Sequence, residues 1–183
     1  MSSMVDFRVL TQCHFLISLM NRNPQAVSFL PAIQVQESLL RDVSEIPDGS
    51  ISLEPFRSLA RSVGVPLSIV VDKNTSRESC VVEMHRTKAD VWICIDGTIH
   101  FEIGGVMQNP RIHADKNGVP HDEEIRAKSL SLGTVYTLGK GAVLYIPEGQ
   151  PHKHWTHEGS ARLWVVKIPA RDPFPLDAIE GLN

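Results

Sequence analysis

Three residues near the middle of the chain have the types and spacing of metal ligands. Glu83 and His85 are two positions apart, and successive side chains of a β-strand point to opposite faces, so these two share a face. After a short bend at 87–89, Asp90 begins the next apolar stretch, where it could stand beside His85. Imidazole and carboxylate groups bind divalent transition metals, so this segment predicts part of a metal site.

A second histidine group lies near the end of the chain. Pro147, Glu148 and Gly149 form a turn signal, and His152 and His154 follow it. By the same alternation the two histidines face one way. Sequence spacing alone does not bring His152 to His85, but a closed β-barrel places distant strands side by side.

The elements that must position these residues change in character near residue 64. Before it, two stretches have helical patterns, 32–42 and 55–63, and Gly64 is a stop signal. We expect residues 1–63 to form an N-terminal arm, through Asn23, and a helical segment.

After residue 64, short runs rich in β-branched residues alternate with turn residues. Such runs, without helices between them, predict an antiparallel sandwich or barrel over residues 64–169. Asp96-Gly97 and Gly104-Gly105 are expected as hairpin turns. The predicted strands are 67–71, 80–85, 91–95, 98–103, 134–138, 142–146 and 162–168.

Two segments depart from this pattern. Residues 108–131 are polar and predict a long loop, which could act as a lid. The prolines at 169, 173 and 175 predict that residues 170–183 form an extended surface tail.

The motifs around the histidines resemble those of the cupin superfamily. The second cupin motif is matched at Gly141, Pro147, Gly149 and His152, with Thr156 in place of the final Asn. The resemblance covers roughly residues 65–169.

The first cupin motif is matched in a variant form. His85 and Gly97 fit the pattern, and Asp90 replaces its Glu. Glu83 stands where the first His is expected, and Arg77 stands in place of the leading Gly.

The resemblance implies an all-β fold: a cupin-type antiparallel β-barrel, also called a double-stranded β-helix or jelly roll, here with a short helical N-terminal segment. It also implies one divalent transition metal, Fe, Mn, Zn or Ni, held by Glu83, His85, Asp90 and His152. A homodimer is common among such proteins and is expected here; the exposed barrel edges and apolar residues 15–20 also favour it.

Other roles stay open for the same residues. His85 and His152 could be polar groups satisfied inside the barrel, and Glu83 could pair with an arginine. Asp90 could cap the turn or hold His85 in place. The large aromatic residues Trp92, Tyr145, Trp155 and Trp164 are expected in the core. The remaining histidines, at positions 14, 100, 113, 121 and 157, are expected to be solvated.

Composition limits the classes of partner. Lys and Arg number 18 against 21 Asp and Glu, a formal net charge of −3, which gives no reason to expect a nucleic acid. Three cysteines without CxxC spacing favour a reducing, cytoplasmic setting, and no apolar run is long enough to span a membrane.

The sequence therefore predicts a metal-dependent cupin enzyme acting on a small oxygen-bearing molecule in the barrel, with His154 moving protons. Oxygenase, isomerase, lyase and cyclase chemistry all remain open. The alternative is a module that binds a metal or metabolite without turnover.

Overall fold

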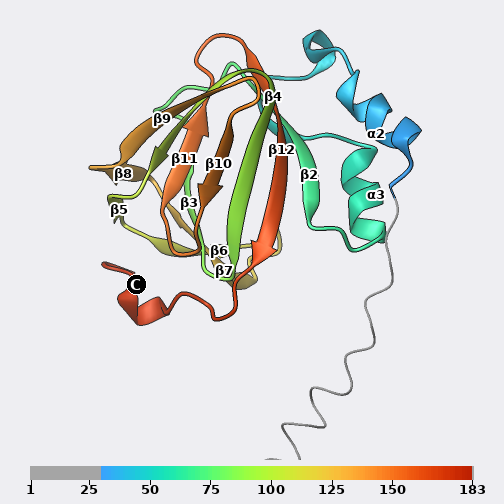
Figure 1. Cartoon of the computed structure of the whole chain (residues 1–183). Helices are drawn as coiled ribbons and strands as arrows, with labels where there is room; N and C mark the ends of the chain where they lie inside the picture. The colour runs from blue at the N-terminus through green and yellow to red at the C-terminus, as the bar shows by residue number, and fades with distance from the viewer. Residues whose placement is uncertain (1–29, 183) are drawn as a thin grey trace, which may run out of the picture.

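A curled antiparallel β-sheet dominates the computed structural model, which describes residues 30–182 (Figure 1). The strand order is β1-β2-β12-β4-β11-β3-β7-β6, with β9 and β10 also paired to β4, and β5 and β8 form a separate pair. The strands are β1 (Gly49–Ser52), β2 (Leu67–Lys73), β3 (Val82–His85), β4 (Lys88–Ile103), β5 (Val106–Gln108), β6 (Arg111–Ala114), β7 (Pro120–Ala127), β8 (Ser129–Ser131), β9 (Thr134–Gly139), β10 (Val143–Ile146), β11 (His152–Trp155) and β12 (Ser160–Pro169).

The long strand β4 connects the two halves of the sheet. Its first part pairs with β10 and β12, and its second part pairs with β9 and β11. One continuous strand of 16 residues replaces the two strands and the hairpin turn predicted at Asp96-Gly97. That prediction was wrong because Gly97 serves another need: a Cβ there would lie 2.0 Å from the Ser160 carbonyl oxygen, and its φ is +80°. Glycine thus lets β4 pass close to β12 where it changes partners.

The concave side of the sheet encloses the main apolar core. Ile99, Phe101 and Leu163 are fully buried there, together with Ile146 of β10. Trp92 packs edge-on against Phe101, with ring centroids 5.2 Å apart. The core fills one part of the barrel and leaves the region around Glu83 lined by polar groups.

The segment 108–131 is not the loop that its polarity predicted. It contains β6, β7 and β8, and β7 pairs with β3 over four residues. Ile125, Ala127 and Leu130 are buried against Met84, while Glu124 and Arg126, which alternate with them on β7, lie on the face of the sheet that carries Glu83 and His85. Only the turn around Gly118 remains a loop tip, closed by Asp115 accepting hydrogen bonds from two backbone N–H groups.

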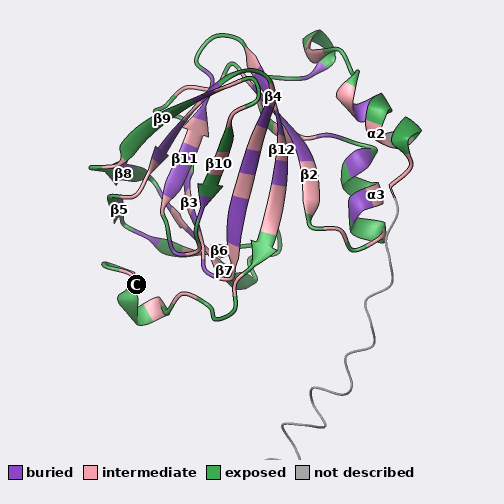
Figure 2. Cartoon of the chain, in the orientation of Figure 1, coloured by how far each residue is buried: buried purple, intermediate pink, exposed green. Residues whose placement is uncertain are grey.

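Two helices and a 3-10 turn cover the outer face of β2. They are α2 (Ala32–Leu39), η1 (Val43–Glu45) and α3 (Phe56–Ser62), close to the predicted ranges. Phe56 is fully buried and meets Trp164 edge-on at 5.3 Å, with Ile69 and Val71 of β2 in the same cluster. Figure 2 shows buried positions on α3 where it faces the sheet.

The C-terminal segment is only partly extended. A 3-10 helix, η2 (Leu176–Ala178), interrupts it, and its apolar residues join the cluster around Met84. The Phe174 carbonyl accepts a hydrogen bond from Arg86 Nε at 2.7 Å, and its ring lies so close to Gly149 that no Cβ fits there.

The structure confirms the predicted all-β, antiparallel fold with a short helical N-terminal segment. Trp92 and Trp155 are buried as expected, Trp164 is half-buried, and Tyr145 is 57% exposed on β10, so its core assignment was wrong. The predicted arm through Asn23 and the apolar run 15–20 lie outside the described residues. Within residues 30–182, no helix has the length and apolarity needed to cross a membrane.

The contact between Phe56 and Trp164 predicts that the helical segment is energetically coupled to the sheet. Phe56→Ala should lower the free energy of unfolding by about 3–5 kcal/mol, because it removes a buried ring and leaves a cavity. Ile33→Ala, at an exposed position of α2, should change it by less than about 0.5 kcal/mol. Urea unfolding followed by circular dichroism measures both, and equal effects of the two variants would contradict the packing.

Candidate metal centre

Glu83, His85 and His152 converge at one end of the barrel interior. One ligand atom from each lies within 4.8 Å of the others. Glu83 Oε1 is 3.5 Å from His152 Nε2 and 4.0 Å from His85 Nε2, and the two imidazole centroids are 5.5 Å apart. The structure thus brings together three of the four predicted metal ligands.

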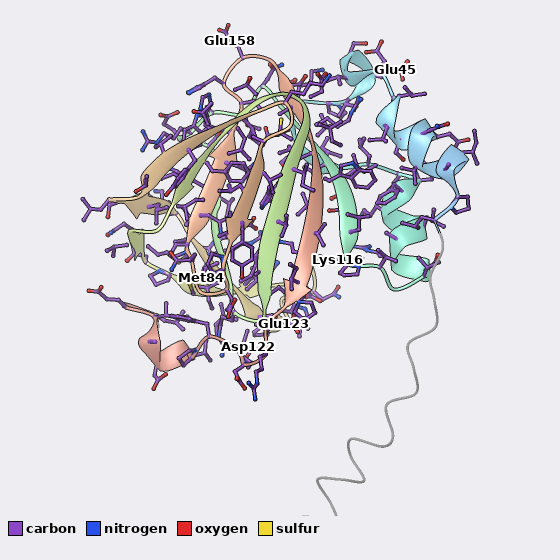
Figure 3. The ribbon with its side chains drawn as sticks, in the orientation of Figure 1. Glu45, Met84, Lys116, Asp122, Glu123 and Glu158 are labelled. Carbon is purple, nitrogen blue, oxygen red and sulfur yellow. The ribbon has the colours of Figure 1, made fainter. Side chains whose placement is uncertain are left out.

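Strand pairing produces this convergence. Glu83 of β3 lies directly opposite His152 of β11, and antiparallel neighbours in register project side chains to the same face. His85 ends β3 two residues later, on the same face. Met84, between them, points away into the cluster near the C-terminal segment; it is labelled in Figure 3.

The orientation of His152 suits a metal ligand. Its Nδ1 lies 2.9 Å from the Gln150 carbonyl oxygen, which can only accept, so Nδ1 carries the proton. The lone pair of Nε2 then points to the centre, and Nε2 is buried without a hydrogen bond. A backbone carbonyl that fixes the far nitrogen is the usual support of a ligating histidine. An unpartnered buried nitrogen facing a carboxylate fits a divalent metal.

The electrostatics keep Glu83 in the form that binds metals. Burial opposes its charge, but the imidazole of His152, 3.5 Å away, and then that of His85 outweigh burial, so the pKa of Glu83 lies far below its usual range. Burial likewise works against a charged His152, yet Glu83 and then Asp90 raise the pKa of His152 above its usual value. The negative charge of Glu83 thus favours a cation between the two side chains, as a proton on His152 or a divalent metal would supply.

Asp90, the fourth predicted ligand, lies beside the group with its carboxylate engaged by Lys167. Lys167 Nζ is 2.6 Å from Asp90 Oδ2 and 2.7 Å from His85 Nε2. Asp90 Oδ2 is 3.5 Å from His85 Nε2 and 3.8 Å from His152 Nε2. Burial disfavours the Asp90 charge, but His85 and Lys167 hold its pKa below the usual value.

Sequence reasoning missed Lys167. It lies in the predicted strand 162–168 and directly opposite Asp90 in the β4–β12 pair. The available signal was a single lysine in an apolar strand, two positions from Val165, which lies on the buried face.

His154, the predicted proton carrier, is held by a buried acid. Its Nδ1 donates to Asp72 Oδ2 at 2.7 Å, and the same carboxylate accepts hydrogen bonds from the hydroxyls of Thr75 and Thr156. Asp72 is fully buried. The Nε2 lone pair of His154 has no partner in the described part of the chain, so it is free to accept a proton.

A cavity of about 560 Å³ opens beside these groups. Glu83, His154 and Lys167 line it, together with Trp92 and Arg126. Cys80 also lines it, but burial and then the charge of Asp72 raise the pKa of its thiol to about 11. The thiol is therefore protonated at neutral pH and is not a thiolate ligand or nucleophile.

A second cavity of about 270 Å³ reaches the centre from the other side of Lys167. Lys167 and His85 line it with His113 and His121, which lie opposite each other on β6 and β7. His121 is exposed, as expected. Asp122 and Glu123 mark this end of the sheet, and Glu158 lies at the opposite end (Figure 3).

No protein-family model and no curated protein matches the chain. Similar solved structures include the hydroxypropylphosphonic acid epoxidase from S. wedmorenis, with a TM-score of 0.42, 16% identity, and coverage of 79% of this chain and 64% of that chain. The Clostridium difficile EutQ protein gives a TM-score of 0.40, 14% identity, and coverage of 72% and 70%. The chain thus spans less than two thirds of the length of the epoxidase.

These likenesses are low, with identities of 14–16% and TM-scores of 0.40–0.42. The curled antiparallel sheet and the meeting of both histidine motifs inside it are what the cupin resemblance predicted. Fold and site together define a cupin-type β-barrel with a candidate metal centre.

The Asp72–His154 hydrogen bond predicts a single imidazole tautomer. In neutral His154 the proton should reside on Nδ1, as long-range ¹⁵N–¹H NMR of the ring can show. Asp72→Ala should give a mixture of tautomers and lower stability by about 1–3 kcal/mol, because buried donors lose their acceptor. Thr156→Val, which keeps the Asp72–His154 bond, is the matched control. An unchanged tautomer in Asp72→Ala would show that Asp72 does not orient the ring.

Proposed function

We propose that the protein is a metal-dependent enzyme acting on a small oxygen-bearing organic molecule in the barrel. Glu83, His85 and His152 would hold one divalent transition metal, with Asp90 beside them as the fourth predicted ligand. The observation that carries the proposal is the convergence of three ligand atoms within 4.8 Å, with His152 Nε2 buried and unpartnered.

The donor set limits the metal. Two imidazoles and a carboxylate form the set typical of mononuclear Fe(II) sites with open positions, and Mn, Zn or Ni also accept such donors. A bound metal would supply Lewis acidity toward a carbonyl, enol or carboxylate oxygen. Metal identity and reaction type stay open among oxygenase, isomerase, lyase and cyclase chemistry.

His154 favours an enzyme over a binding module. A module that only holds a metal has no need of an imidazole that lines the cavity and is fixed there by a buried acid. Such a group accepts or returns a substrate proton. The cavity of about 560 Å³ has the size of a small-molecule site. The homodimer and the cytoplasmic setting stay predictions.

The metal assignment predicts the effect of ligand removal. His85→Ala and His152→Ala, purified without chelators, should each retain less than about a tenth of the wild-type metal, since each removes a ligand. His100 lies on another part of the sheet, where its imidazole is hydrogen-bonded to Thr137. His100→Ala should therefore retain the wild-type metal content. Metal analysis by mass spectrometry measures all three, with circular dichroism as the check on folding. Full metal content in either ligand variant would contradict the site.

Glu83→Gln separates the two roles of this carboxylate. Gln keeps the size but lacks the charge, so a ligand role predicts metal affinity at least about tenfold weaker. A purely structural role, as the charge partner of His152, predicts unchanged metal affinity and an altered free energy of unfolding. Competition with a fluorescent chelator measures the affinity, and denaturant unfolding measures the stability.

The enzyme assignment predicts that an oxygen-donor molecule reaches the metal. Enols, hydroxy acids and sugars added to the Co(II)-substituted protein should include at least one that shifts its visible spectrum. The same compound should be converted by wild type and far more slowly by His154→Ala. A spectrum unchanged by the whole panel would favour the binding module.

A further inference from the structure

Lys167 is a cationic side chain built into the candidate metal centre. It faces Asp90 across the β4–β12 pair, so the sheet register places it there. Its ammonium contacts both Asp90 Oδ2 and His85 Nε2. Its side chain keeps 31% exposure, whereas Asp90 keeps 1%. Lys167 thus pairs with a buried carboxylate while part of its own side chain remains exposed.

The contact with His85 conflicts with metal binding at the same atom. An ammonium group can only donate, so His85 Nε2 accepts from Lys167 through its single lone pair. That lone pair cannot serve Lys167 and a metal together. Metal binding at His85 would release the Lys167 ammonium from this nitrogen and leave it hydrogen-bonded to Asp90 Oδ2.

The released ammonium would keep its place at the cavity wall. Lys167 lines both the larger and the smaller cavity, and its ammonium contacts Asp90 and His85 of the centre. Asp90 stays opposite Lys167, because the β4–β12 pairing fixes its position and its side chain is 1% exposed. Lys167 is therefore held by Asp90 at the cavity wall, beside the candidate metal centre.

From this geometry we infer that Lys167 recognises an anionic oxygen, a carboxylate or enolate, on the molecule bound next to the metal. Asp90 then acts mainly as the anchor of Lys167. This inference rests on the proposed function and assigns its substrate class: small organic anions, in preference to neutral sugars or amides. Arg126 lines the same cavity and bonds Glu124 through its Nε at 2.6 Å, whereas Lys167 Nζ lies at the centre itself, in contact with Asp90 and His85.

The test compares acetate with the neutral acetamide on the Co(II)-loaded protein. Wild type should bind acetate at least about tenfold more tightly than acetamide, as followed by visible absorption. Lys167→Met should weaken acetate binding at least about tenfold and leave acetamide unchanged, while Lys167→Arg restores part of the preference. Acetate binding equal to wild type in Lys167→Met would overturn the inference.

Two further measurements keep the result interpretable. Lys167→Met should bind Co(II) at least as tightly as wild type, because no ammonium group then competes with the metal for His85 Nε2. Weaker Co(II) binding in this variant would contradict the idea that metal binding releases Lys167 from His85. If the uncompensated Asp90 prevents folding, Asp90→Asn combined with Lys167→Met removes both charges, and it should show the same loss of acetate preference. Wild type that takes up no Co(II) would instead refute the metal site, and the role of Lys167 with it.

Discussion

The pairing of β3 with β11 is the constraint on which the centre depends. It sets Glu83 directly opposite His152, although the two motifs lie far apart in the sequence. A shift of one residue in this register would turn one of the two side chains to the other face of the sheet. The apolar cluster behind β3, with Met84 and Ile125 at its centre, stabilises this register from the other face.

Charge balance explains why the polar end of the barrel is tolerated. Asp90 is almost fully buried and is matched by Lys167, while Glu83 is matched by His152. A buried carboxylate without such a partner would cost several kcal/mol. The same arrangement leaves His152 Nε2 without a hydrogen bond, while His85 Nε2 beside it is hydrogen-bonded to Lys167. Asp72 and His154 form a separate acid–imidazole pair nearby, so that in the proposed function metal binding and proton transfer would use different histidines.

The sequence predicted the parts of this account that depend on alternation and turn signals. The strand faces of Glu83, His85 and His152 follow from a period of two, and the all-β fold from the spacing of turns. The errors arose where tertiary contacts decide. Asp96-Gly97 has the sequence of a hairpin turn, but in the structure Gly97 allows β4 to pass close to β12. The local sequence contains no sign of this contact. The polar segment 108–131 forms strands because its few apolar residues, Ile112, Ile125, Ala127 and Leu130, pack with Met84 of β3 in one cluster. Lys167 was missed because its partner Asp90 is defined by a register that no local pattern contains.

The most direct test of the account is a crystal structure of protein purified without chelators, with anomalous scattering measured at the absorption edge of the metal found. The account predicts a single strong peak at about 2.0–2.3 Å from the nearest atoms of Glu83, His85 and His152, with at least one coordination position open to the cavity. A peak elsewhere in the barrel, or a fully loaded protein with no peak between these three residues, would contradict it.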